Sequence, residues 1–177
     1  TYDELYRYIE HNTWLEYFGN AQTYVGENWI DFEAEISNVV KSLDFARERI
    51  EYGGSIRELD NADSIIVTGI WKASKWNLQD AFKGLLEIDK FIAFLSEELD
   101  KLIRVLEIYI DDFVGKIRIV KRSQDILDIN VDYIVSFNYS DTYERLYGIK
   151  GKQEYDYIHG KADANNSRVS NNMVLGI

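Results

Sequence analysis

Two polar side chains in the C-terminal part of the sequence have the chemistry of an active site. Asn138 follows the apolar run 133–135, and His159 ends the alternating run 155–159. An amide can orient a hydroxyl group or a water molecule, because it both donates and accepts hydrogen bonds. An imidazole can accept a proton near neutral pH. Neither side chain is a nucleophile of the serine or cysteine kind, so the pair indicates orientation and general-base chemistry.

Each of these residues lies where a predicted β-strand ends. Residues 133–135 are aromatic or β-branched and predict a buried strand, and from Thr142 the apolar residues recur at helical spacing until Gly148. In residues 155–159 the rings of two tyrosines and His159 alternate with Asp156 and Ile158. This alternation predicts a second strand, which Gly160 ends. Ligands of open α/β sheets bind at the carboxyl ends of strands. A joint site therefore requires the two strand ends to lie side by side.

Both residues also have an ordinary structural interpretation. An asparagine between a strand and a helix is often only a helix cap, and a histidine before a glycine is often a hydrogen-bonded turn residue. The other histidine, His11, lies at a predicted break between a helix and a loop and is interpreted as structural or exposed. The chain has no cysteine, so a zinc site would need two distant histidines and carboxylates. We expect no metal.

The first 127 residues predict a mostly helical region. Apolar residues recur at threes and fours in residues 1–18, 31–50 and 82–117, and no proline interrupts them. Residues 19–26 predict a loop. Residues 64–69 fit a strand or a helix equally well.

The stripe along residues 82–117 predicts packing against the 31–50 helix in a bundle. Self-association through the same stripe, as a coiled coil, is the alternative. The charged residues on its other side are expected to face solvent and are Glu97, Glu98, Asp100, Lys101, Arg104 and Glu107. The end of the helical pattern and the start of the strands predict two domains, residues 1–127 and 128–177.

Charge and composition limit the partners. The chain carries 31 acidic and 20 basic residues, a formal charge of −11, which disfavours a broad nucleic-acid surface. The dense basic cluster at residues 116–122 is interpreted as the solvated end of a helix. No apolar run approaches the ~20 residues of a membrane span, and the absence of cysteine fits a reducing cytoplasm.

Three segments together resemble a known family. Ser-Phe-Asn-Tyr-Ser-Asp-Thr-Tyr-Glu-Arg-Leu at 136–146, Tyr-Ile-His-Gly-Lys at 157–161 and Val-Leu-Gly-Ile at 174–177 resemble the C-terminal half of the AbiH family of phage abortive-infection proteins. Residues 28–33 also resemble the family's Trp-x-Asp-Phe-Glu segment. That family is similar to the SIR2-like NAD-binding superfamily.

The resemblance implies an α/β fold with a SIR2-like, Rossmann-type sheet in residues 128–177, including a third strand at 172–177, beside a large helical bundle. It implies that Asn138 and His159 are catalytic in cleaving the bond between nicotinamide and ribose in NAD. The residues implied to hold the nucleotide are Ser136, Tyr139, Asp141 and Gly160.

The sequence departs from the resembled pattern in two places. SIR2-like proteins usually have an aspartate directly after the Asn-Tyr pair, where this chain has Ser140, with Asp141 one place on. The Gly-Asn-Gly-Phe-Asp segment with which AbiH proteins begin does not occur in the chain. We therefore expect the chain to be a fragment of a longer protein.

The expected function is that of a cytoplasmic bacterial effector that binds and hydrolyses NAD or a related nucleotide when a phage-derived trigger is sensed. The alternative is a non-catalytic module that binds a nucleotide or a protein, with the helical region as its interaction surface. A third reading, a metal-dependent nuclease using Asp31 and Glu33, competes with their ordinary role as acids in the first turn of a helix.

Overall fold

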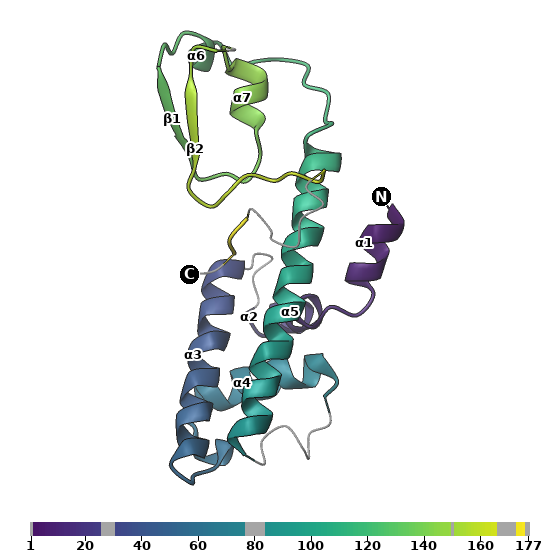
Figure 1. Ribbon diagram of the computed structural model, residues 1–177, viewed down its shortest axis with the longest axis vertical. Helices are drawn as coiled ribbons and strands as arrows, with labels where there is room; N and C mark the ends of the chain where they lie inside the picture. Colours follow the sequence, from purple (N-terminus) through teal and green to yellow (C-terminus); the bar gives the residue numbers. More distant parts are fainter. Residues whose placement is uncertain (1, 26–30, 77–83, 150, 166–172, 176–177) are drawn as a thin grey trace. The chain divides into compact units, whose positions relative to one another are not determined.

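The computed structural model describes residues 2–25, 31–76, 84–149, 151–165 and 173–175 (Figure 1). The chain forms two compact units, Thr1–Leu102 with Leu175–Ile177, and Ile103–Val174. Helix α5, Leu85–Tyr109, supplies residues to both units. The prediction of a helix-rich α/β chain is confirmed, because helices dominate the described residues and the sheet among them has two strands.

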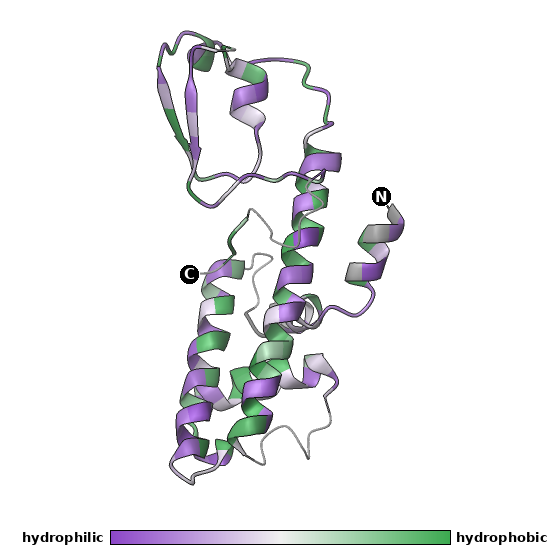
Figure 2. Ribbon diagram, viewed as in Figure 1, coloured by the Kyte–Doolittle hydropathy of each residue, from purple (hydrophilic) through white to green (hydrophobic). Residues whose placement is uncertain are grey.

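The first unit is helical. Helix α4 packs against both α2 and α3, and Trp76 lies against Phe91 and Phe94 of α5, with ring centroids 5.5 and 5.6 Å away. Hydrophobic and hydrophilic residues alternate around these helices (Figure 2), as expected for helices that bury one face. The elements before α5 are α1 (Tyr2–Ile9), α2 (Thr13–Val25), α3 (Phe32–Glu51), the short 3-10 helix η1 (Ile56–Glu58) and α4 (Asn61–Ser74).

Several helix boundaries follow from local side-chain chemistry. The break predicted at His11 is confirmed between α1 and α2, where the Asn12 side chain accepts hydrogen bonds from the backbone N–H groups of Trp14 and Leu15 and so caps α2. Asp31 caps α3 in the same way, accepting from Ala34 N at 3.1 Å. The loop predicted at 19–26 is wrong for residues 19–25, which continue α2; Gly26 lies outside the described residues.

The ambiguous run at 64–69 belongs to helix α4. Its buried side chains are Val67, Ile70, Trp71 and Ala73, and spacings of three and four place Val67, Ile70 and Trp71 on one helical face. A strand would have placed alternate residues on opposite faces. Burial against the neighbouring helices therefore decided between the two readings.

The long predicted helix is confirmed from Leu85, while residues 82 and 83 lie outside the described residues. It ends earlier than predicted, because α5 passes at Tyr109 into a π-helical turn, η2 (Ile110–Val114), followed by Gly115. Its buried apolar side chains are Ile88, Phe91, Leu95, Leu102, Ile103, Val105 and Ile108. None of the described helices combines the length and apolarity that crossing a bilayer requires.

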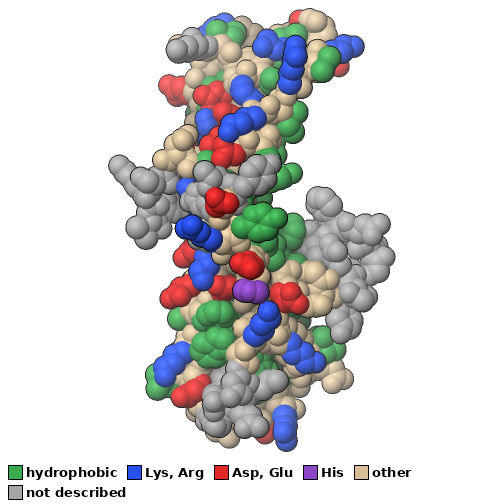
Figure 3. Space-filling model, turned by 90° about the vertical axis from the view of Figure 1, so that its right-hand side faces the viewer, with side chains coloured by type: hydrophobic (Ala, Val, Ile, Leu, Met, Phe, Trp, Pro, Cys, Tyr) green, Lys and Arg blue, Asp and Glu red, His purple; other side chains and the backbone are tan. Residues whose placement is uncertain are grey.

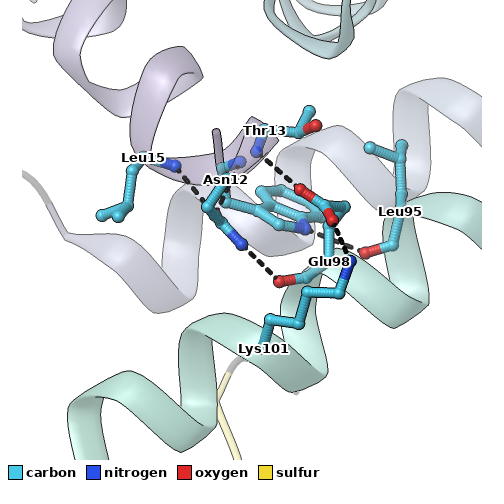
Figure 4. A network of polar contacts seen from close by, with 7 residues as sticks. Asn12, Thr13, Leu15, Leu95, Glu98 and Lys101 are labelled. Atoms are coloured by element: carbon cyan, nitrogen blue, oxygen red, sulfur yellow. Dashed lines mark hydrogen bonds and ion pairs between the residues drawn. The ribbon is translucent and has the colours of Figure 1, made fainter. Parts of the chain in front are cut away.

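The expectation that Glu98 faces solvent is wrong. Its side chain is buried at 5% exposure, and its carboxylate accepts from Thr13 N at 2.9 Å and from Lys101 Nζ at 2.7 Å (Figure 4). The backbone carbonyl of Glu98 accepts from the Asn12 amide at 2.7 Å, and Trp14 Nε1 donates to Leu95 O. The start of α2 is thereby attached to α5 by polar contacts, and the Glu98 carboxylate satisfies the Thr13 N–H, which has no partner within α2.

The second unit contains the sheet. Strands β1 (Tyr133–Ser136) and β2 (Glu154–Tyr157) are parallel and are connected through helix α7 (Thr142–Tyr147), and the short helix α6 (Gln124–Leu127) precedes them. The prediction that β1 is buried is wrong, because Tyr133 and Val135 on one of its faces are exposed. The third predicted strand is absent in its described residues, 173–175, which have no regular structure.

We predict that Glu98→Gln lowers the free energy of unfolding at neutral pH by about 1–3 kcal/mol, because it removes a charged acceptor from a buried network. Burial alone would raise the pKa of Glu98, but the hydrogen bonds from Lys101 and Thr13 outweigh it, so this pKa is lowered. Glu98 therefore stabilises the fold above the unfolded-state pKa of glutamate, and this contribution is lost as pH falls through the lower folded-state pKa.

Urea unfolding of wild type and Glu98→Gln from pH 7 to pH 3 measures this contribution. The difference in stability should shrink below about pH 4.5. Glu97→Gln, at the exposed neighbouring position, is the matched control and should change stability little. A Glu98→Gln difference that grows on acidification would contradict the assignment.

Candidate functional site

The parallel pairing of β1 with β2 brings the two predicted strand ends together. Ser136 is paired with Tyr157 at the end of the ladder, and Ile158 N donates to Ser136 O at 3.0 Å. Asn138 and His159 each follow this last pair by two residues. The pairing therefore leads both residues out of the same edge of the sheet at the same offset.

Aromatic rings flank the His159 imidazole. The rings of Phe137 and Tyr139 each lie 6.0 Å from it, centroid to centroid, and both are tilted. His159 is half-buried, whereas Asn138 is exposed. The site therefore combines an imidazole held among rings with an amide open to solvent.

Two residues predicted to hold a nucleotide have structural hydrogen bonds instead. Ser136 Oγ accepts from Asn138 N and donates to Asn138 O, both at 3.2 Å, and so closes the turn that carries the amide. The Tyr139 hydroxyl donates to Val174 O at 2.8 Å, and Val174 N donates to His159 O at 3.0 Å. These contacts hold the backbone on either side of Asn138 and His159.

Gly160 forms the turn after His159. Its φ of 82° lies in the left-handed region, where a residue with a Cβ is strained, and its N–H donates to Tyr157 O at 2.9 Å. The backbone conformation at this position thus favours glycine over any residue with a side chain. The turn sends the chain toward Ala162, whose N–H donates to Tyr139 O at 2.9 Å.

Asp141 lines a hollow beside helix α7, unlike Asn138 and His159. It occupies the N-cap position of α7, where its side chain makes no capping hydrogen bond, and it lines a hollow of about 430 Å³ with Glu144, Arg145 and Tyr155. Asn138 and His159 do not line that hollow. Of the six predicted residues, Asp141 is therefore the one that lines this hollow.

Sequence reasoning missed an ion pair that joins residues 136–146 to residues 157–161. Glu144 of α7 accepts from Lys161 Nζ at 2.7 Å and from the Tyr157 hydroxyl at 3.1 Å. The lysine, and after it the hydroxyl, hold the pKa of Glu144 below its usual value, while burial and the carboxylate raise the pKa of Tyr157. Helix α7 is thereby attached to the end of β2 and to the turn beyond His159.

A second missed group binds the loop that follows. Arg104, Glu107 and Asp111 are spaced on one helical face at i, i+3 and i+7, and Glu107 is 1% exposed. Glu107 accepts from Asp163 N at 3.2 Å, Asp111 accepts from Ala164 N at 2.9 Å, and Arg104 donates to Ala164 O at 2.9 Å. Arg104 and Glu107 were expected to face solvent, and this expectation is wrong because both bind the irregular backbone at 163–164.

Chemically, the arrangement offers orientation by an amide and proton transfer by an imidazole. Among the described residues, no three His, Cys, Asp or Glu side chains come together in a possible metal site.

We predict that Glu107→Ala destabilises the fold by about 3–5 kcal/mol, because it leaves the Arg104 guanidinium without its buried partner. The guanidinium donates to Glu107 at 2.8 Å and is itself mostly buried. Chemical denaturation measures the loss, and hydrogen exchange should show faster exchange of the Asp163 amide. Glu97→Ala, on an exposed position of the same helix, is the control. Equal stability of the two variants would contradict the role of this contact.

Comparison with known proteins identifies the family of the chain. No curated protein and no solved structure gives a significant match. The sequence profile described as bacteriophage abortive infection AbiH matches residues 1–177, which is the whole chain. The chain therefore belongs to the AbiH family of bacteriophage abortive infection proteins.

Proposed function

We propose that the second unit belongs to a SIR2-like domain that binds NAD or a related nucleotide at the ends of β1 and β2, and that the full-length protein hydrolyses it during phage defence. One observation carries the proposal: the in-register parallel pairing that leads Asn138 and His159 out of the same sheet edge. Membership of an abortive infection family supports the defence role.

The proposed reaction breaks the bond between the nicotinamide nitrogen and the ribose carbon. Nicotinamide leaves with the electron pair of that bond, and the oxygen of a water molecule bonds to the carbon. The Asn138 amide orients the water or a ribose hydroxyl, and His159 accepts the proton that the water loses.

The surrounding residues fit this division of roles. Ser136 fixes the backbone of Asn138, and the rings of Phe137 and Tyr139 cover the flanks of the imidazole. Asp141 lines the hollow of about 430 Å³ beside α7, so it contacts a ribose hydroxyl only if the ligand extends into that hollow. Asn138 and His159 therefore carry the proposal, and Asp141 is secondary.

We predict that the full-length protein releases nicotinamide from NAD, and that Asn138→Ala and His159→Ala each lower the rate by at least about 100-fold. Chromatography of free nicotinamide measures the rate, and circular dichroism checks folding. His11→Ala and Asn20→Ala remove the same side chains at exposed positions of the other unit and should keep full activity. Turnover that survives in either Asn138→Ala or His159→Ala would overturn the assigned chemistry.

A non-catalytic binding module is the second candidate. It is favoured by the hydrogen bonds that already occupy Ser136 and Tyr139, because side chains engaged with the backbone are less available to hold NAD in position for cleavage. Titration calorimetry that shows NAD binding without release of nicotinamide would support this candidate. The nuclease reading gains no support from Asp31, whose carboxylate caps α3; degradation of nucleic acid only with added divalent metal would favour it.

A further inference from the structure

An exposed basic stretch follows the π-helical turn. We call residues 116–122 the basic segment; Figure 1 shows its extended path between the end of α5 and α6. It contains four cations and three β-branched residues, of which Val120 is 96% and Ile117 is 62% exposed. Lys116 pairs with Asp112, whereas the other cations form no ion pair with a carboxylate of the described residues. The interpretation of this cluster as the end of a helix is wrong, because residues 116–122 all follow η2, and only Lys116 forms an ion pair with a residue of that turn.

The basic segment borders a hollow of about 300 Å³. Lys121, Arg122 and Arg145 line it together with aliphatic side chains of the segment and Leu146, and none of the described residues that line it is acidic. Figure 3 shows acidic and basic side chains interspersed over much of one face of the molecule. A hollow of one charge sign with aliphatic walls fits a partner that presents both carboxylates and apolar groups.

The same chain presents such a surface in its first unit. We call the acidic hollow the cavity of about 490 Å³ between the end of α3 and the start of α4. Four carboxylates and one guanidinium line it, and its aromatic side chains are exposed, Tyr52 by 87% and Phe45 by about half. Those carboxylates belong to Glu48, Glu58, Asp60 and Asp63.

We propose that the basic segment of one chain docks into the acidic hollow of a second copy. The carboxylates would pair with Arg118, Lys121 and Arg122, and the rings of Tyr52 and Phe45 would cover the exposed β-branched residues and accept cation–π contacts from the arginines. Each surface alone exposes apolar side chains to water. In the proposed contact, opposite charges pair and the apolar side chains of both surfaces are buried.

Nucleic acid fits the basic segment less well than a second copy. The net charge of −11 repels a polyanion, and the described residues that line the hollow beside the basic segment include no aromatic ring on which a base could stack. An acidic hollow on the chain itself is the complementary partner that the structure provides.

The two surfaces differ, so the contact is heterologous and can continue from copy to copy. Sedimentation velocity of the full-length protein should show a mass that grows with concentration and falls as salt is added, because screening weakens charge pairing. Reversing the basic segment with Arg118→Glu, Lys121→Glu and Arg122→Glu should weaken association at least about tenfold, since like charges would then meet. Reversing the acidic hollow with Glu48→Lys and Glu58→Lys should do the same.

Mixing the two reversed variants gives the sharpest test. One retains an intact acidic hollow and the other an intact basic segment, and their two reversed surfaces also carry opposite charges, so the equimolar mixture should regain the association that each variant alone has lost. A variant with Lys41→Glu and Lys72→Glu, which reverses charges at exposed positions outside both surfaces, should associate like wild type.

Three results would overturn the proposal: a wild-type protein that stays monomeric, reversed variants that still associate fully, or a mixture that stays monomeric. Circular dichroism verifies that the variants fold. Should one fail to fold, the salt series on wild type still decides, because association insensitive to salt contradicts pairing of these charged surfaces.

Discussion

The parallel pairing of β1 with β2 is the constraint on which the candidate site depends. Parallel strands cannot be joined by a tight turn, so the chain must cross over between them, and α7 makes that crossing. The register then fixes what emerges at the carboxyl edge, Asn138 beyond one strand and His159 beyond the other. A shift of one residue would turn the alternate side chains of β2 to the opposite face, so the register also decides whether an amide and an imidazole can serve one ligand.

Two buried carboxylates on α5 perform the same physical task in different places. Glu98 accepts the backbone N–H of Thr13 at the start of α2, and Glu107 accepts that of Asp163 in the loop beyond β2. In both cases a charged acceptor satisfies a backbone N–H that has no partner within a helix or a strand ladder, and a neighbouring cation balances the charge. Buried charge is therefore used here to attach the start of one helix and one loop to a regular helix.

Family membership and chemistry are supported by different observations. The whole-length match assigns the chain to the abortive infection family, but a family or fold does not by itself specify a reaction. The chemical proposal depends instead on the local arrangement of Asn138 and His159, with Ser136 and Tyr139 holding the backbone around them. The association proposal depends on a third feature, the separation of charge between the basic segment and the acidic hollow.

Local sequence alone determined the elements whose signals are short-range. The caps at Asn12 and Asp31, the strand at 133–136, the helix from Thr142 and the turn at Gly160 follow from side-chain chemistry and periodicity within a few residues. Tertiary structure decided what depends on distant partners. The helical state of 64–69, the burial of Glu98 and Glu107, and the neighbours of His159 all require segments far along the chain, because burial and long-range hydrogen bonds leave no periodic signal in the sequence.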